Sequence, residues 1–142
     1  MMTLERKRLE EQVLARRLPA NTYVFRDMNT SCPILTIAAR TNNKKVYTLN
    51  IHLKDFPESI PKVFVSKMLY NHDGRPLDTP NGAMHIWGAE NNCTRLCHYG
   101  SESWTPMVSL YKVYVKCRLW LEMYERHLET GNNIDYYLNH QK

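Results

Sequence analysis

Hydrophobic residues recur at helical spacing near the beginning of the chain. We predict a helix that starts at a Thr3 cap and runs to about Arg17, because the residue before Pro19 is pushed out of the α region. The apolar face of this helix is expected to comprise Leu4, Leu9, Val13 and Leu14. The arginines, lysines and glutamates between these positions are interpreted as a solvated face.

A second and wider helical stripe lies near the end of the chain. Ser109 is a suitable cap for a helix running to about Glu129, and Gly131 stands just past its end. The stripe, which we expect to lie well into the core, comprises Leu110, Val113, Tyr114, Cys117, Trp120, Leu121, Tyr124 and Leu128. Residues 134–138 are interpreted as a last helical turn.

Between these helices the pattern changes to that of strands. Four segments are predicted to form a four-stranded antiparallel meander: residues 23–26, 34–40, 45–53 and 63–65. Strict alternation in the third strand gives the core face Tyr47, Leu49, Ile51 and Leu53. Residues 41–44 contain two asparagines and are predicted to be a tight hairpin loop. The chain is therefore predicted to be an α+β domain.

Residues 85–110 show no clear period, although they contain two cysteines, two histidines and two tryptophans. Irregular backbone is costly to order, so a stretch of this kind is often retained because a site is built from it. A thiol beside polar groups, followed by the Trp-x-Pro turn at Trp104, is a candidate nucleophile. Both Cys93 and Cys97 meet this description, whereas Cys117 is expected in the core and Cys32 is interpreted as structural.

Length and composition add few constraints. With 142 residues we expect one domain over residues 1–142. No apolar run approaches the ~20 residues of a membrane helix, and residues 1–8 contain no apolar region of a secretory signal, so the cytoplasm is the expected location. The net charge of +5 admits nucleic acid as a partner, but none of the usual nucleic-acid-binding signatures is present, and we expect no such partner.

Zinc is an alternative use of the same segment. Cys93, Cys97, His98 and His85 are suitable ligand types, but Cys-x3-Cys is a less typical spacing and no second pair follows. We therefore expect no metal and no other cofactor.

The order of these elements and three motifs resemble the ubiquitin-conjugating enzyme (UBC) fold. The first motif is similar to the family's aromatic-Pro-x-x-x-Pro-x-Val-x-Phe segment and comprises Phe56, Pro57, Pro61, Val63 and Phe64. Leu96-Cys97 resembles the apolar-Cys active-site pair, and Trp104-Thr105-Pro106 resembles the run that enters the following helix. The resemblance implies that Cys97 forms a thioester, with Cys93 as the rival nucleophile.

The bacterial branch of the family is the closer resemblance. Its pattern of His-aromatic, Leu-Cys-x-Tyr, Trp, Trp-Leu-x-x-Tyr-Glu and Thr-Gly is similar to residues here at His85, 96–99, Trp104, 120–125 and 130–131. This implies a role in CBASS-type antiphage defence operons. There the protein would be a cysteine acyltransferase that takes the C-terminus of a cGAS-like nucleotidyltransferase, or a ubiquitin-like tail, and transfers it to a target. A separate activating enzyme is an expected partner, although direct loading by the nucleotidyltransferase is the alternative.

The sequence departs from the family at one place. The common His-Pro-Asn segment before the cysteine is missing, so oxyanion support has no certain counterpart. Asn91, Asn92 and His98 are candidates for it, while His85 and Trp104 are expected to support the loop structurally. The alternative function is a non-catalytic interaction domain of the same fold that binds a partner protein.

Overall fold

The alternation of the third predicted strand is reproduced in the structure, a computed structural model that describes residues 2–139. Tyr47, Leu49, Ile51 and Leu53 are buried on one face of the sheet, as predicted. The strands are β1 (Tyr23–Arg26), β2 (Ile34–Arg40), β3 (Val46–His52), β4 (Lys62–Val65), β5 (Pro80–Asn81), β6 (Ile86–Glu90) and β7 (Cys93–Leu96). The helices are α1 (Leu4–Arg17), α2 (Leu110–Thr130) and α3 (Ile134–Asn139).

The predicted meander is only part of the sheet. The sheet has seven strands in the order β1-β2-β3-β4-β7-β6-β5, and every pair is antiparallel. The predicted α+β class is confirmed, but the number of four strands is wrong. Strands β6 and β7 fall in the stretch at 85–110 that shows no clear period, and β5 has only two residues. Short strands with a glycine bulge carry little periodic signal.

A row of apolar residues crosses the sheet and fixes the position of β7. Leu35 pairs with Ile51, Ile51 with Val63, and Val63 with Leu96, so four strands contribute aligned side chains. All four are at most 1% exposed. Because a shift by one residue would turn these side chains to the other face, the row fixes the register of β7 and of the residue that follows it.

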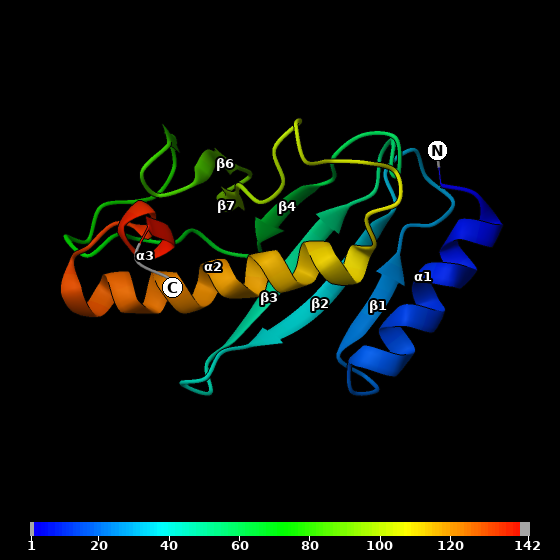
Figure 1. Ribbon diagram of the computed structural model, residues 1–142, viewed down its shortest axis with the longest axis horizontal. Coiled ribbons are helices and arrows are strands. Elements are labelled where there is room, and N and C mark those ends of the chain that lie inside the picture. The colour runs from blue at the N-terminus through cyan, green and yellow to red at the C-terminus, as the bar shows by residue number, and fades with distance from the viewer. Residues whose placement is uncertain (1, 140–142) are drawn as a thin grey trace.

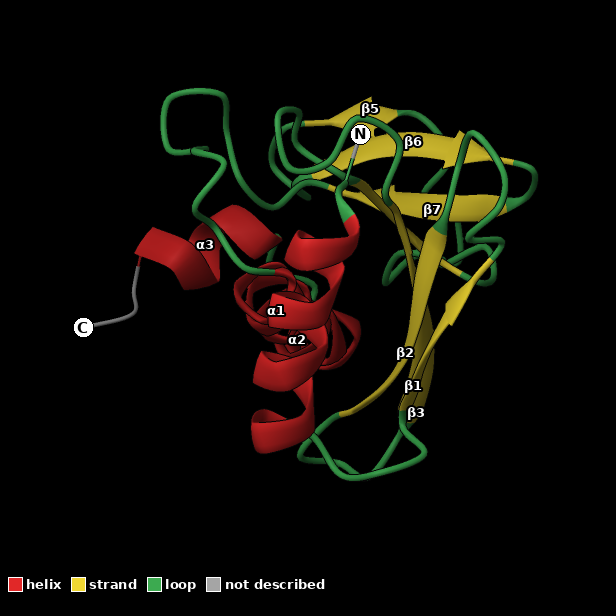
Figure 2. Ribbon diagram, turned by 90° about the vertical axis from the view of Figure 1, so that its right-hand side faces the viewer, coloured by secondary structure: helices red, strands yellow, loops and turns green. Residues whose placement is uncertain are grey.

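Both long helices lie on one side of the sheet (Figures 1 and 2). The α2 stripe is buried as predicted, apart from Leu128, which is half-buried. Both ends of α2 also lie where they were predicted. The Ser109 hydroxyl accepts a hydrogen bond from the amide of Lys112, and Gly131 adopts φ +81°. That conformation is readily reached only by glycine, which explains why the helix ends there.

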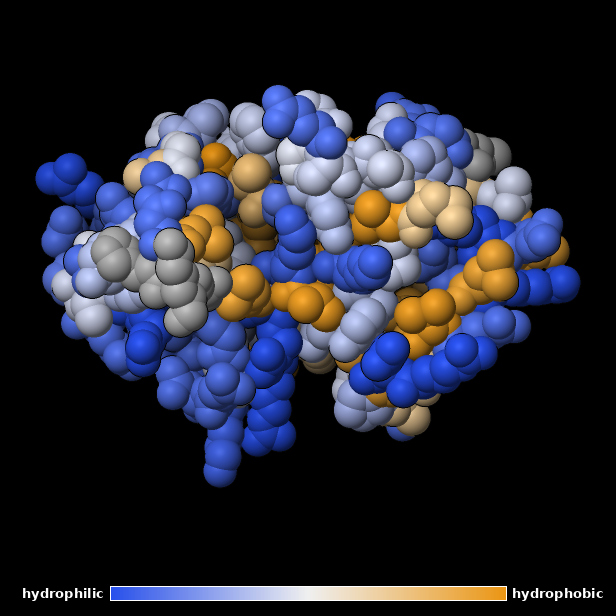
Figure 3. All heavy atoms as spheres, viewed as in Figure 1, coloured by the Kyte–Doolittle hydropathy of each residue, from blue (hydrophilic) through white to orange (hydrophobic). Residues whose placement is uncertain are grey.

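The apolar face predicted for α1 is partly wrong. Leu4 and Leu9 are 63% and 52% exposed, whereas Leu14 is fully buried. Figure 3 shows separate groups of apolar side chains over α1 and α2 on this face of the molecule. Glu10, interpreted from sequence as solvated, is only 3% exposed, because it accepts a hydrogen bond from the amide of Leu110 at the start of α2.

No helix among residues 2–139 is both long enough and apolar enough to cross a bilayer.

Candidate functional site

Cys97 follows directly after the last residue of β7. Leu96 is buried in the sheet, and the backbone N–H of Cys97 donates to the carbonyl of His85 over 2.9 Å. The thiol itself is half-buried and not bonded to another cysteine. The sheet therefore fixes the backbone of Cys97 while the chain leaves it at the beginning of a loop.

Two cations influence the thiol of Cys97. Burial raises the pKa of Cys97, and the positive charges of Arg95 and Lys116 partly oppose that increase. Arg95 precedes it on β7 and lies 5.7 Å from the Trp87 ring, whereas Lys116 comes from α2 and lies 4.1 Å from the ring of Tyr99. A thiol that is protonated at neutral pH but lies near cations is compatible with acyl exchange, because intrinsic nucleophilicity falls as thiol pKa falls.

The loop after Cys97 is held by aromatic contacts. Trp104 donates its indole N–H to the carbonyl of Pro57 over 3.1 Å. Its ring meets those of Tyr99 and Phe56 edge-on, at centroid distances of 5.7 and 6.1 Å. Trp104 thus connects the loop after Cys97 to the proline segment before β4.

Arg6 of α1 holds the other end of this loop. Its guanidinium donates to the carbonyls of Pro106 and Val108 and to the carboxylate of Glu10. The same carboxylate binds the Leu110 amide over 2.7 Å. Sequence reasoning missed this Arg6–Glu10 pair, since the i,i+4 spacing of opposite charges is also typical of a solvated helix face.

His98 is directed away from solvent. Its Nε2–H donates to the carbonyl of Pro61 over 2.8 Å, and its Nδ1 is buried without a hydrogen-bond partner among the described residues. Burial lowers the pKa of His98 to about 4, with Arg95 and Lys116 acting in the same direction. The ring is therefore neutral at physiological pH and fixes the residue after Cys97 to the start of β4.

This burial predicts an acid sensitivity specific to His98. The unfolded chain takes up the proton near pH 6.5, whereas the folded chain takes it up near 4. The contribution to stability is therefore complete above pH 6.5 and is lost as the pH falls toward 4, by on the order of 3 kcal/mol. Urea denaturation across this range should show that His98→Gln, which keeps an N–H donor but does not titrate, loses less stability than wild type. Equal losses in the two proteins would contradict the assignment.

Asn91, Asn92 and Cys93 lie at the opposite end of β7 from Cys97. Asn91 and Asn92 form the turn between β6 and β7, with φ of 51° and 62°, and both are exposed. They are separated from Cys97 by the length of β7, on the order of 13 Å at strand spacing. The structure therefore does not bring them together with Cys97. Cys93, the rival nucleophile, is half-buried beside this turn, at the other end of the strand.

His85 is brought to Cys97 through its backbone. Its carbonyl accepts from Cys97, and its Nε2 lies 2.8 Å from the carboxylate of Asp135 in α3. With φ +53°, this histidine occupies a backbone conformation that non-glycine residues seldom adopt. The four residues considered as an alternative zinc site do not converge, since no group of three or more metal-binding side chains occurs among residues 2–139.

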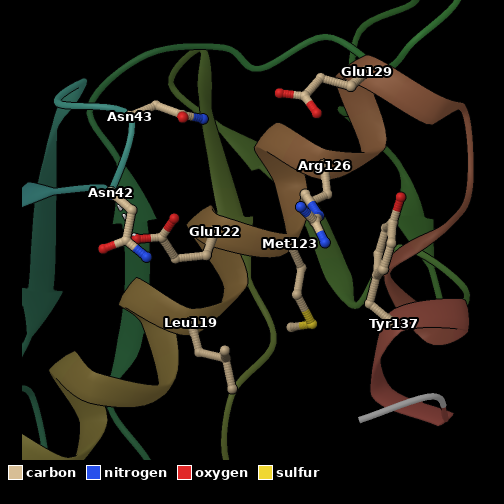
Figure 4. A pocket seen from close by; sticks show the side chains of 8 residues that line it. All are labelled: Asn42, Asn43, Leu119, Glu122, Met123, Arg126, Glu129 and Tyr137. Atoms are coloured by element: carbon tan, nitrogen blue, oxygen red, sulfur yellow. Dashed lines mark hydrogen bonds between the residues drawn. The ribbon is translucent and has the colours of Figure 1, made fainter.

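A cavity of about 460 Å³ lies elsewhere, between the β2–β3 loop, α2 and α3 (Figure 4). Its lining contains Glu122, Arg126 and Tyr137, but no cysteine or histidine. The carboxylate of Glu122 already has two partners, because it accepts a hydrogen bond from the amide of Asn42 and forms an ion pair with Arg118. The cavity has no thiol in its lining and is separate from the Cys97 site.

Comparison with known proteins adds nothing to this geometry: no protein-family model, no curated protein and no solved structure matches the chain.

Proposed function

We propose that this protein is a ubiquitin-conjugating-like acyltransferase in which Cys97 forms a thioester with the C-terminus of a partner protein. The observation that carries the proposal is the position of Cys97. Its backbone is fixed by the sheet, its thiol is half-buried rather than enclosed, and the following loop is held by Trp104. A nucleophile for acyl transfer needs this combination of a fixed backbone and an accessible sulfur.

The assignment to the UBC fold is part of the proposal. It is supported by the element order of helix, antiparallel meander, cysteine segment and long helix, together with the proline and tryptophan motifs. In this proposal the carrier is the tail of a cGAS-like nucleotidyltransferase or a ubiquitin-like protein in a CBASS-type antiviral system, loaded with or without a separate activating enzyme. We place the reaction in the cytoplasm, where free thiols such as the four in this chain persist.

The reaction follows from thioester exchange. The Cys97 thiolate attacks the activated carbonyl of the tail, a tetrahedral oxyanion forms, and the leaving group departs as the thioester closes. An acceptor amine then takes the acyl group and releases Cys97 as a thiol. Asn91 and Asn92 are not included as oxyanion donors, because they lie in the turn at the other end of β7.

Alkylation of the native protein tests the proposal. Cys97 should react with iodoacetamide without denaturant, whereas Cys117 should react only after unfolding, because it is fully buried and burial raises its pKa. Peptide mapping separates the four cysteines. The companion test is a gel of the protein co-expressed with its carrier, in which reductant should remove a band of the summed mass. An unreactive Cys97 and no reducible band would support the alternative of a non-catalytic interaction domain.

A further inference from the structure

A second thiol lies in a basic cavity that the proposed function does not use. The cavity has a volume of about 300 Å³, lies at the end of β3 and the beginning of β4, and contains Cys32, His52, Lys54 and Lys62. Cys32 is half-buried and free. The cavity therefore brings a nucleophile, a base and two ammonium groups together.

His52 is positioned to take the thiol proton. Its Nδ1 lies 3.9 Å from the Cys32 sulfur, and its ring packs on Phe64 at a centroid distance of 4.8 Å, which restrains its orientation. Burial lowers the pKa of His52, the Lys62 and Arg26 charges add to this effect, and Glu90 opposes it. At neutral pH the imidazole is thus unprotonated and free to accept a proton.

The cavity is positively charged, which favours a negatively charged reaction partner for the thiol. Lys62 is directly paired with His52 across β3 and β4, and Lys54 follows two residues after His52. Both lysines are exposed, and neither forms an ion pair within residues 2–139. Asp55 is the one acidic group in the lining, so positive charge predominates. Reactive cysteines typically occur in such electropositive, partly exposed surroundings.

We propose that Cys32 is a thiolation site that reacts with small disulfides bearing carboxylates, which Lys54 and Lys62 bind beside the sulfur. The thiol proton passes to His52 Nδ1, and the thiolate attacks one sulfur of the reagent. The reagent's S–S bond breaks as the Cys32–S bond forms, and the departing thiolate takes the proton from His52. The protein thiol is oxidised and half of the reagent is reduced, so the exchange balances without another oxidant.

Two disulfides of opposite charge test this proposal on the full chain. Oxidised glutathione carries carboxylates and cystamine carries amines, and peptide mapping over time identifies which cysteine is modified first. We expect oxidised glutathione to modify Cys32 before Cys93 and Cys97, and faster than cystamine does, by on the order of tenfold. First modification at another cysteine, or equal rates with the two disulfides, would overturn the proposal without affecting the role of Cys97.

Variants separate the contributions of charge and base. The double variant Lys54→Gln, Lys62→Gln should erase the preference for oxidised glutathione while leaving the cystamine reaction unchanged or faster. His52→Gln should slow both reagents by about tenfold or more, because it removes the proton acceptor. A charge preference that survives in the lysine variant would reject the cavity as the binding site. If a variant fails to fold, the rates at which the two disulfides modify the wild-type protein still decide whether Cys32 is the thiolation site.

Discussion

Replacing Cys97 with alanine is expected to abolish every reducible adduct between this chain and its carrier. The reason is chemical, because an acyl group held as a thioester has no other attachment point once the sulfur is removed. Stability should change little, by about 1 kcal/mol or less, since the thiol is small and half-buried. A non-reducing gel of the co-expressed proteins measures the adduct, and urea denaturation measures the stability.

Cys93→Ala is the matched control for this experiment. Cys93 is a half-buried thiol on the same strand, but it lies next to the β6–β7 turn rather than the loop held by Trp104. We expect this variant to form the adduct as the wild type does. The opposite result, with the adduct lost in Cys93→Ala and retained in Cys97→Ala, would transfer the role to the rival nucleophile.

Replacing Glu10 with alanine is expected to lower the free energy of unfolding by about 3 kcal/mol. The Glu10 side chain is 4% exposed and joins α1 to the start of α2, because its carboxylate accepts hydrogen bonds from the Leu110 amide and from Arg6. Its removal leaves a buried N–H without a partner and a guanidinium without its anion. Urea or thermal denaturation, followed by circular dichroism, gives the difference.

Glu11→Ala provides the comparison for that loss. Glu11 belongs to the same helix and also faces a cation at i,i−4, but its carboxylate is 3.7 Å from Lys7 and 46% exposed. Exposed pairs of this kind contribute about 0.5 kcal/mol or less. Equal losses in the two variants would show that the contact between Glu10 and Leu110 contributes nothing to stability.

The local elements were largely predictable from sequence. The caps at Thr3 and Ser109, the left-handed Gly131 and the stripe of α2 were predicted correctly, since each depends on residues within one or two turns. The hairpin loop at 41–44 was also predicted, and within it Lys44 is the residue with a positive φ. Strand β7 was missed because it contains only four residues, of which Thr94 is polar and Arg95 is charged.

The candidate site was only partly predictable. Cys97 and Trp104 were identified through a resemblance in sequence, and their roles stay predictions. That His98 is buried against Pro61 could not be inferred, because a histidine in an irregular segment is as readily solvated. Sequence also could not show which groups lie at each end of β7. Cys97, just after the strand, lies near Lys116 of α2, whereas Asn91 and Asn92 lie in the distant turn before the strand.

Sequence alone determined where the helices begin and end, which faces of α2 and β3 are apolar, and which thiols are chemically plausible. Those features follow from backbone periodicity and from hydrogen bonds between near neighbours. The tertiary structure alone decided that Glu10 is buried, that Leu96 completes a row across four strands, and that Cys32 shares a basic cavity with His52. These depend on contacts between residues far apart in the chain, which packing of the whole core selects and no local pattern encodes.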